Sequence, residues 1–202
     1  MRKAFQWTVG GLLAGFISSL VLLANPESSP KFNAMNAEAK IEVATFGAGC
    51  FWGVEHNFRS VPGVIEAYSG YEGGKTANPT YRQVCEGDTF HAEVVQVTFD
   101  ASKVSYRQLV EYFFKLHDPT QVNRQGPDYG TQYRSVIFWH SEAQKQIAEA
   151  VTQQLTAAKK FKNPLATQLV PAATFWKAEE YHQRYFEKNA VHSCPVIEFK
   201  SE

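Results

Sequence analysis

The sequence predicts an α+β domain in which helices pack on a mixed β-sheet. Short stretches alternate apolar and polar residues with the period of strands, and longer stretches repeat apolar residues at helical spacing. These stretches follow one another irregularly instead of in a regular βα repeat, which favours an α+β architecture. The chain has 202 residues, a length that suits one domain with an extension.

The amino terminus has the composition of a signal peptide or a membrane anchor. Arg2 and Lys3 precede an uncharged stretch from Ala4 to Pro26 that is rich in leucine, valine, isoleucine and phenylalanine. A signal-peptide core runs to about 15 residues, whereas a spanning helix needs about 20. The length favours a retained anchor through residues 4–24, and Ala37-Glu38-Ala39 offers a cleavage site well past the apolar stretch if the segment is a signal. Both interpretations place the domain outside the cytoplasm.

Composition divides the whole chain into successive segments. Residues 1–26 are the signal or anchor, and residues 27–40 are a linker with prolines, serines and asparagines and no apolar periodicity. Residues 41–190 hold the strand and helix patterns, and residues 191–202 form a tail that contains Cys194. The folded domain is therefore expected to begin near Ile41.

The first strand of the domain leads into a helix at a cysteine. Alternation from Ile41 to Thr45 predicts the strand, and helical spacing from Phe51 to Phe58 predicts the helix. A thiol at Cys50 would feel the partial positive charge of unpaired backbone N–H groups, which favours the nucleophilic thiolate. The alternative is a small buried apolar cysteine. The neighbouring glycines favour an uncovered sulfur, with Phe51 and Trp52 as the walls of an apolar pocket.

Later strands are expected at Val64–Tyr68, Glu93–Phe99 and Val136–Trp139, where β-branched and aromatic residues gather. Helices are expected at Ser105–His117 and Ser141–Phe161. Each begins with a capping box, a serine followed three residues later by glutamine. A last helical pattern lies near Ala178 to Lys188.

One of these strands carries a carboxylate at the end of an apolar row. In a strand, Glu93, Val95, Val97 and Phe99 point to the same face. Spacing alone favours a glutamate that leans into solvent at the strand end. If the carboxyl group is instead buried, desolvation raises its pKa, and the protonated form can donate a proton near neutral pH.

Several motifs, in order along the chain, resemble those of the A-type peptide methionine sulfoxide reductases. They are Gly49-Cys50-Phe51-Trp52-Gly53, Gly70-Tyr71-Glu72-Gly73-Gly74, Asn78-Pro79-Thr80-Tyr81, His91-Ala92-Glu93-Val94-Val95 and Gly130-Thr131-Gln132-Tyr133-Arg134-Ser135. The resemblance extends from Ile41 to Lys188. It implies a mixed sheet with a ferredoxin-like core. It also implies thiol-dependent reduction of the S epimer of methionine sulfoxide in proteins, and it leaves open whether the free amino acid is a substrate.

The resemblance also implies roles for individual residues. Cys50 attacks the sulfoxide sulfur and becomes a sulfenic acid, while Phe51 and Trp52 contact the substrate methyl group. The departing oxygen is stabilised and protonated by Glu93, Tyr81 and Tyr133, and Asp128 helps to bind substrate. Without the resemblance, the two tyrosines would be ordinary half-buried residues and Asp128 a turn residue.

The remaining cysteines, Cys85 and Cys194, differ in context. The resemblance and its tail position imply that Cys194 condenses with the sulfenic acid of Cys50 to a disulfide, which a thioredoxin-like dithiol then reduces. Many relatives carry two cysteines in a longer tail, whereas this chain has one there. In an exported protein the alternative is a structural disulfide between Cys85 and Cys194. Otherwise Cys85 is expected to be a structural thiol near the site.

Composition bears on several other classes of function. The formal net charge is zero and there is no basic run, so nothing predicts a nucleic-acid partner. The six histidines and three cysteines lack close metal-binding spacings, so neither a metal nor any other cofactor is expected.

Two alternative functions stay open from sequence. A cysteine-nucleophile hydrolase or acyltransferase needs a histidine base, and His56, His91, His117 and His182 are the candidates. A membrane-tethered binding module would instead use Phe51 and Trp52 as a hydrophobic contact.

Overall fold

The computed structural model describes residues 39–189 of the chain. The predicted signal or anchor, nearly all of the linker, and the tail with Cys194 lie outside the described residues and stay predictions. Within residues 39–189, no helix is long and apolar enough to cross a membrane.

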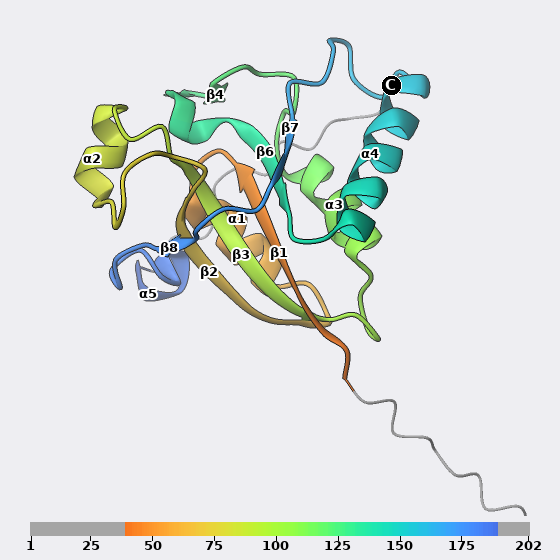
Figure 1. Cartoon of the computed structure of the whole chain (residues 1–202), viewed down its shortest axis with the longest axis horizontal. Helices are drawn as coiled ribbons and strands as arrows, with labels where there is room; N and C mark the ends of the chain where they lie inside the picture. Colours follow the sequence, from red (N-terminus) through yellow and green to blue (C-terminus); the bar gives the residue numbers. More distant parts are fainter. Residues whose placement is uncertain (1–38, 190–202) are drawn as a thin grey trace, which may run out of the picture. The chain divides into compact units, whose positions relative to one another are not determined.

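A six-stranded mixed sheet forms the centre of the domain (Figure 1). Its strands are β1 (Ile41–Ala48), β2 (Val64–Glu72), β3 (Ala92–Asp100), β6 (Ser135–Trp139), β7 (Gln168–Pro171) and β8 (Trp176–Lys177). They lie in the order β7-β6-β1-β3-β2-β8. Neighbouring strands are antiparallel except β6 and β7, which are parallel.

Two helices complete a ferredoxin-like core. Helix α1 (Phe51–Arg59) connects β1 to β2, and α3 (Tyr106–Leu116) follows β3 on the way to β6. With the central strands in the order β6-β1-β3-β2, these elements form a β-α-β-β-α-β unit. A further helix, α4 (Glu142–Ala157), packs beside α3 and leads to β7 at the sheet edge. The predicted α+β fold with a mixed sheet is therefore confirmed.

The main hydrophobic core lies between the sheet and helices α1 and α3. Phe46 of β1 stacks on Phe58 of α1 and Phe113 of α3, with ring centroids 4.8 and 5.5 Å apart. The predicted row on β3, from Glu93 to Phe99, faces this core and is buried. A smaller cluster covers the opposite face of the sheet; its buried members are Ala92, Val94, Val136 and Phe138.

Several element boundaries differ from the predictions. Strand β2 extends past Tyr68 to Glu72, because its last residues pair with the start of β3. Helix α4 ends at Ala157 instead of Phe161, since the chain turns at Lys159 with a left-handed φ of 48°. Its predicted capping box is incomplete, because the Gln144 side chain accepts from the His140 N–H.

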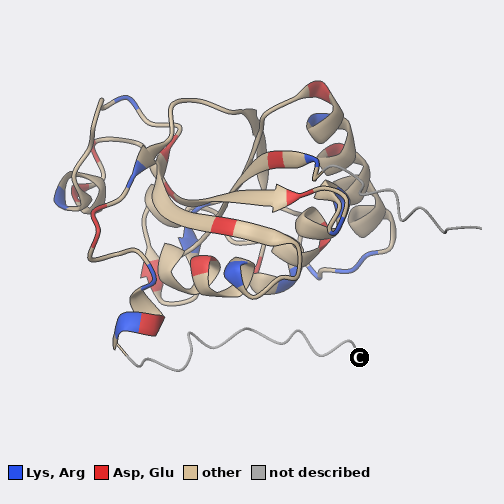
Figure 2. Cartoon of the chain, turned by 90° about the horizontal axis from the view of Figure 1, so that it is seen from below, with Lys and Arg blue, Asp and Glu red and all other residues tan. Residues whose placement is uncertain are grey.

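The carboxyl-terminal part of the described chain also departs from expectation. A helix was expected from about Ala178, but β8 ends at Lys177 and residues 180–184 then make turns. Helix α5 begins only at Tyr185 and runs to Asn189. Acidic and basic residues are interspersed along this segment and over the rest of the described chain (Figure 2).

Candidate active site

Cys50 lies where β1 passes into α1. Gly49 has a φ of +92°, and a Cβ atom there would lie 2.7 Å from the side chain of Gln125. Glycine is therefore required both by backbone conformation and by close approach. Cys50 follows as the N-cap residue of α1 and is partly exposed. The predicted change from strand to helix at this cysteine is confirmed, and Cys50 directly precedes the first turn of α1.

Glu93 is buried next to this helix start, with only 1% of its surface exposed. Its Oε2 accepts a hydrogen bond from the Phe51 N–H at 3.1 Å. Desolvation raises the pKa of Glu93 to about 8; the Phe51 bond opposes this shift, and the negative charge of Asp128 adds to it. The carboxyl group is therefore mostly protonated at neutral pH and able to donate a proton.

Tyr81 and Tyr133 bring two hydroxyl groups close to Glu93. Tyr81 is the first residue of α2 (Tyr81–Glu86), and Tyr133 ends the short 3-10 helix Thr131–Tyr133. Burial raises both phenol pKa values, and the negative charge of Glu93 raises both further. Both hydroxyls therefore stay protonated and can act as hydrogen-bond donors.

Asp128 approaches from a hairpin of β4 (Arg124–Gln125) and β5 (Asp128–Tyr129). The charge of Asp128 affects the pKa values of Glu93 and Tyr133, and the charge of Cys50 affects that of Tyr133. The structure thus brings five residues together from separate elements: Cys50, Tyr81, Glu93, Asp128 and Tyr133. The family resemblance implied this set of residues, and the sequence patterns predicted the elements of Cys50 and Glu93 but not those of Tyr81, Tyr133 and Asp128.

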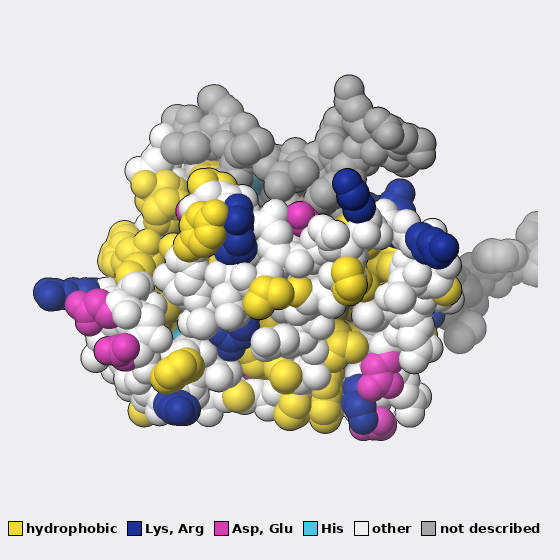
Figure 3. All heavy atoms as spheres, turned by 90° about the horizontal axis from the view of Figure 1, so that it is seen from above, with side chains coloured by type: hydrophobic (Ala, Val, Ile, Leu, Met, Phe, Trp, Pro, Cys, Tyr) yellow, Lys and Arg dark blue, Asp and Glu magenta, His cyan; other side chains and the backbone are white. Residues whose placement is uncertain are grey.

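An aromatic cluster adjoins Cys50 and consists of Phe51, Trp52, Tyr71, Tyr81, His182 and Tyr185. The buried Phe51 ring lies 5.8 Å from Tyr71 and 6.5 Å from Tyr81, between centroids. Trp52 stacks on Tyr185 with centroids 3.7 Å apart and an interplanar angle of 6°. Hydrophobic side chains also gather at the surface on the side of the domain where α2 lies, at the left of Figure 3.

His182 fixes the edge of the Trp52 indole. The indole Nε1–H donates to Nδ1 of His182 at 2.9 Å. Since an indole nitrogen can only donate, Nδ1 is unprotonated and the neutral ring carries its proton on Nε2. Burial lowers the pKa of His182, which favours this neutral form.

Glu179 ties the same carboxyl-terminal segment to Tyr81. Its Oε1 accepts from the Tyr81 N–H at 2.8 Å, and its Oε2 accepts from the Tyr71 hydroxyl at 2.9 Å. Sequence reasoning missed Glu179 and Tyr185, and it considered His182 only as a base. Only a local concentration of aromatic and acidic residues marks this segment in the sequence.

The other histidines proposed as bases have structural contacts. His117 is buried between Ser135 and the Phe113 carbonyl, and burial lowers its pKa to about 4. His91 bonds the Gly74 N–H and the Thr76 carbonyl. The exposed His56 ring lies against Phe186.

Cys85 lies on α2 and is exposed. It hydrogen-bonds with the Tyr81 side chain, so it lies near the site as expected. Its pairing with Cys194 stays a prediction, because Cys194 lies outside the described residues. No cluster of metal-binding side chains is present within residues 39–189.

Fold and site together define a thiol-based enzyme with an acid and two hydroxyl donors beside its cysteine. The family model described as peptide methionine sulfoxide reductase matches residues 42–201, and the chain belongs to this family of enzymes.

Individual relatives agree with this assignment. The chain is 61% identical over 153 residues to peptide methionine sulfoxide reductase MsrA of Acidobacterium capsulatum, covering 76% of this chain and 98% of that one. Mxr1 of Saccharomyces cerevisiae in reduced form matches with a TM-score of 0.73 and 38% identity, covering 78% of this chain and 91% of Mxr1. Mxr1 in complex with Trx2 matches with a TM-score of 0.53 and 28% identity, over 78% and 88% of the two chains.

Proposed function

We propose that this chain reduces the S epimer of methionine sulfoxide, in peptides and proteins, to methionine with Cys50 as nucleophile. The observation that carries the proposal is the buried Glu93 carboxyl, bonded to the N–H of the residue after Cys50. A sulfoxide oxygen leaves poorly as a bare oxide, so the reaction needs an acid at this position. Membership of the family supports the same chemistry.

The first step forms a sulfenic acid. The Cys50 thiolate attacks the sulfoxide sulfur, the sulfur–oxygen bond breaks, and Glu93 supplies the proton that the oxygen takes. The attack forms a transient bond between the two sulfurs; this bond breaks as the oxygen bonds the Cys50 sulfur, so methionine leaves and Cys50 becomes a sulfenic acid. The methionine sulfur is reduced by two electrons and the cysteine sulfur is oxidised by two.

The neighbouring side chains would stabilise and place the substrate. Hydroxyl groups of Tyr81 and Tyr133 donate to the oxygen as its negative charge grows. Phe51 and Trp52 contact the methyl group, which suits their apolar rings. Asp128 accepts hydrogen bonds from polar groups of the substrate next to the sulfoxide side chain.

The second step regenerates the thiol. The Cys194 thiol condenses with the sulfenic acid, releases water and leaves a disulfide between Cys50 and Cys194. A thioredoxin-like dithiol then reduces that disulfide by exchange. The complex of the relative Mxr1 with Trx2 supports a partner of this kind.

We also propose that the domain works outside the cytoplasm, attached or secreted through residues 1–26. The dithiol donor would then act through a membrane relay, since thioredoxin normally works inside. Protease treatment of intact cells, of cells with only the outer compartment opened, and of lysed cells tests the location. Digestion only when the outer compartment is opened supports it, and a soluble cytosolic pool contradicts it.

A single-turnover experiment tests the chemistry. The reduced full-length protein is mixed, without added reductant, with a peptide containing each epimer of methionine sulfoxide. We expect one equivalent of methionine from the S epimer alone, with loss of two thiols. Release from neither epimer contradicts the proposed function, and release with loss of one thiol contradicts the resolving role of Cys194.

A further inference from the structure

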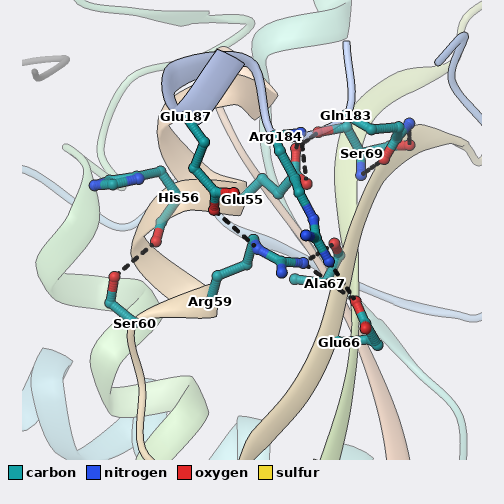
Figure 4. Close-up of polar contacts among 10 residues, drawn as sticks. All are labelled: Glu55, His56, Arg59, Ser60, Glu66, Ala67, Ser69, Gln183, Arg184 and Glu187. Atoms are coloured by element: carbon teal, nitrogen blue, oxygen red, sulfur yellow. Dashed lines mark hydrogen bonds and ion pairs between the residues drawn. The ribbon is translucent and has the colours of Figure 1, made fainter. Parts of the chain in front are cut away.

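Helix α1 buries a carboxylate that the proposed reaction does not use. Glu55 lies one helical turn after Phe51 and is 1% exposed. Its Oε2 accepts from the Ser69 hydroxyl at 2.8 Å, and its two oxygens accept from the Arg184 N–H at 3.0 and 3.1 Å (Figure 4). Burial raises the pKa of Glu55. Desolvation of a carboxylate is unfavourable. We therefore expect the buried Glu55 to have a role, and its hydrogen bonds indicate which one.

The bonds of Glu55 hold a chain reversal. Arg184 has a left-handed φ of +53°, a conformation that is unfavourable for a residue with a side chain. On one side of it, the Gln183 side chain bonds both the N–H and the carbonyl of Ser69 on β2 (Figure 4). The turn is therefore fixed to α1 through Glu55 and to β2 through Gln183.

This reversal allows two nearby residues to contact one indole. His182 precedes the reversal and accepts from the Trp52 Nε1–H at 2.9 Å. Tyr185 follows the reversal and stacks on the Trp52 ring at 3.7 Å. With Arg184 in an ordinary conformation, the chain would not return both rings to the same indole.

We infer that Glu55 is a positioning residue for Trp52. By holding Arg184 in its left-handed turn, it keeps His182 and Tyr185 against the indole. It thereby sets the surface that meets the substrate methyl group. The inference rests on the proposed function, because it takes Trp52 as a contact of that methyl group.

A double-mutant cycle on the full-length protein tests the inference. The variants are Glu55→Ala, Trp52→Phe and both together, and the measured quantity is kcat/KM for an S-epimer methionine sulfoxide peptide. We expect Glu55→Ala to lower kcat/KM by about tenfold or more, and by less than about twofold when Trp52 is already replaced. Equal losses in both backgrounds overturn the inference.

A conservative variant and a matched control separate positioning from general stability. Glu55→Gln keeps an acceptor for the Arg184 N–H, so kcat/KM should stay within about threefold of wild type. Glu187→Ala removes a carboxylate from the same segment, where its ion pair with Arg59 is exposed, and should leave kcat/KM within about twofold. Thermal unfolding of each variant sets the assay temperature at which all remain folded. Loss of activity in Glu187→Ala equal to that in Glu55→Ala overturns the inference.

The cycle also distinguishes this inference from the proposed function. If Trp52→Phe alone leaves kcat/KM unchanged, the assignment of Trp52 to the methyl group is wrong, and the positioning role is wrong with it. If Trp52→Phe lowers kcat/KM and the two losses add, the proposed function stands and only the role of Glu55 is wrong.

Discussion

The two sides of the candidate site are built in different ways. The reactive side consists of Cys50, Phe51 and Glu93. It lies where β1 ends and where α1 and β3 begin, at the junction of the sheet with its first helix. The bracing segment, residues 178–185, lies almost entirely outside regular helices and strands. It reaches the site through side-chain bonds from Glu179 and His182.

This difference separates chemistry from shape. The reactive side depends on backbone groups of a rigid core, so its geometry follows from the fold. The bracing segment meets Trp52 and Tyr81 through one hydrogen bond each, so one substitution can remove either contact. We therefore expect the largest losses of activity from the reactive side and moderate, contact-specific losses from the bracing segment.

Cys50→Ser should give the largest effect. A hydroxyl group is a far weaker nucleophile than a thiolate, so turnover should fall to the assay background, by at least about 10³-fold. Methionine release from the S-epimer peptide is the measurement. Cys85→Ser is the matched control, because serine can still bond Tyr81, and it should retain turnover within about threefold. Turnover retained by Cys50→Ser contradicts the mechanism.

Glu93→Gln should come next. The amide keeps an acceptor for the Phe51 N–H but cannot donate an acidic proton, so the single-turnover rate should fall by about 10²–10⁴-fold. Glu72→Gln is the matched control: Glu72 is also a buried carboxyl, on the other face of the sheet, and burial raises its pKa to about 7. It should leave the rate within about twofold. Equal effects of the two changes would show that Glu93 acts only through stability.

His182→Phe should have a moderate effect. The ring volume stays, but the Trp52 Nε1–H loses its acceptor, a change of about 1–3 kcal/mol for a buried donor. We expect kcat/KM for the peptide to fall by about tenfold, with little change in the rate at which an alkylating reagent modifies Cys50. Tyr185→Phe keeps the stacked ring and should stay within about twofold. An unchanged kcat/KM in His182→Phe removes the bracing role.

Tyr71→Phe should have the smallest effect. It removes one donor to Glu179 but leaves the Tyr81 N–H bond in place. The free energy of unfolding should fall by about 1 kcal/mol, as measured by urea denaturation. Activity at a temperature where the protein is folded should change by less than about threefold. A loss of activity as large as that of Glu93→Gln would place Tyr71 in the chemistry.

Sequence patterns predicted the position of Cys50 because its signals are local. The position of Cys50 follows from a strand pattern, a glycine and a helix pattern that are adjacent along the chain. The helix at Tyr81 was missed, although Thr80 and Gln83 form a complete capping box there. Its six residues are too few to show apolar periodicity.

The bracing segment and the burial of Glu93 required the structure. His182 contacts Trp52 across 130 positions of sequence, and no periodic signal connects them. Spacing placed Glu93 at a strand end and favoured solvent exposure. The extension of β2 to Glu72 puts Tyr71 opposite Glu93, and α1 covers the carboxyl group. Burial therefore results from the pairing of distant strands.

The most direct test of the central claim is the pH dependence of the single-turnover rate. Glu93 must be protonated to act, so its raised pKa predicts a rate that falls as the pH rises through about 8. The fall should persist in Glu72→Gln and disappear in Glu93→Gln. If the rate of the Glu93→Gln variant still falls near pH 8 as in wild type, the account is contradicted, because another group would then supply the proton.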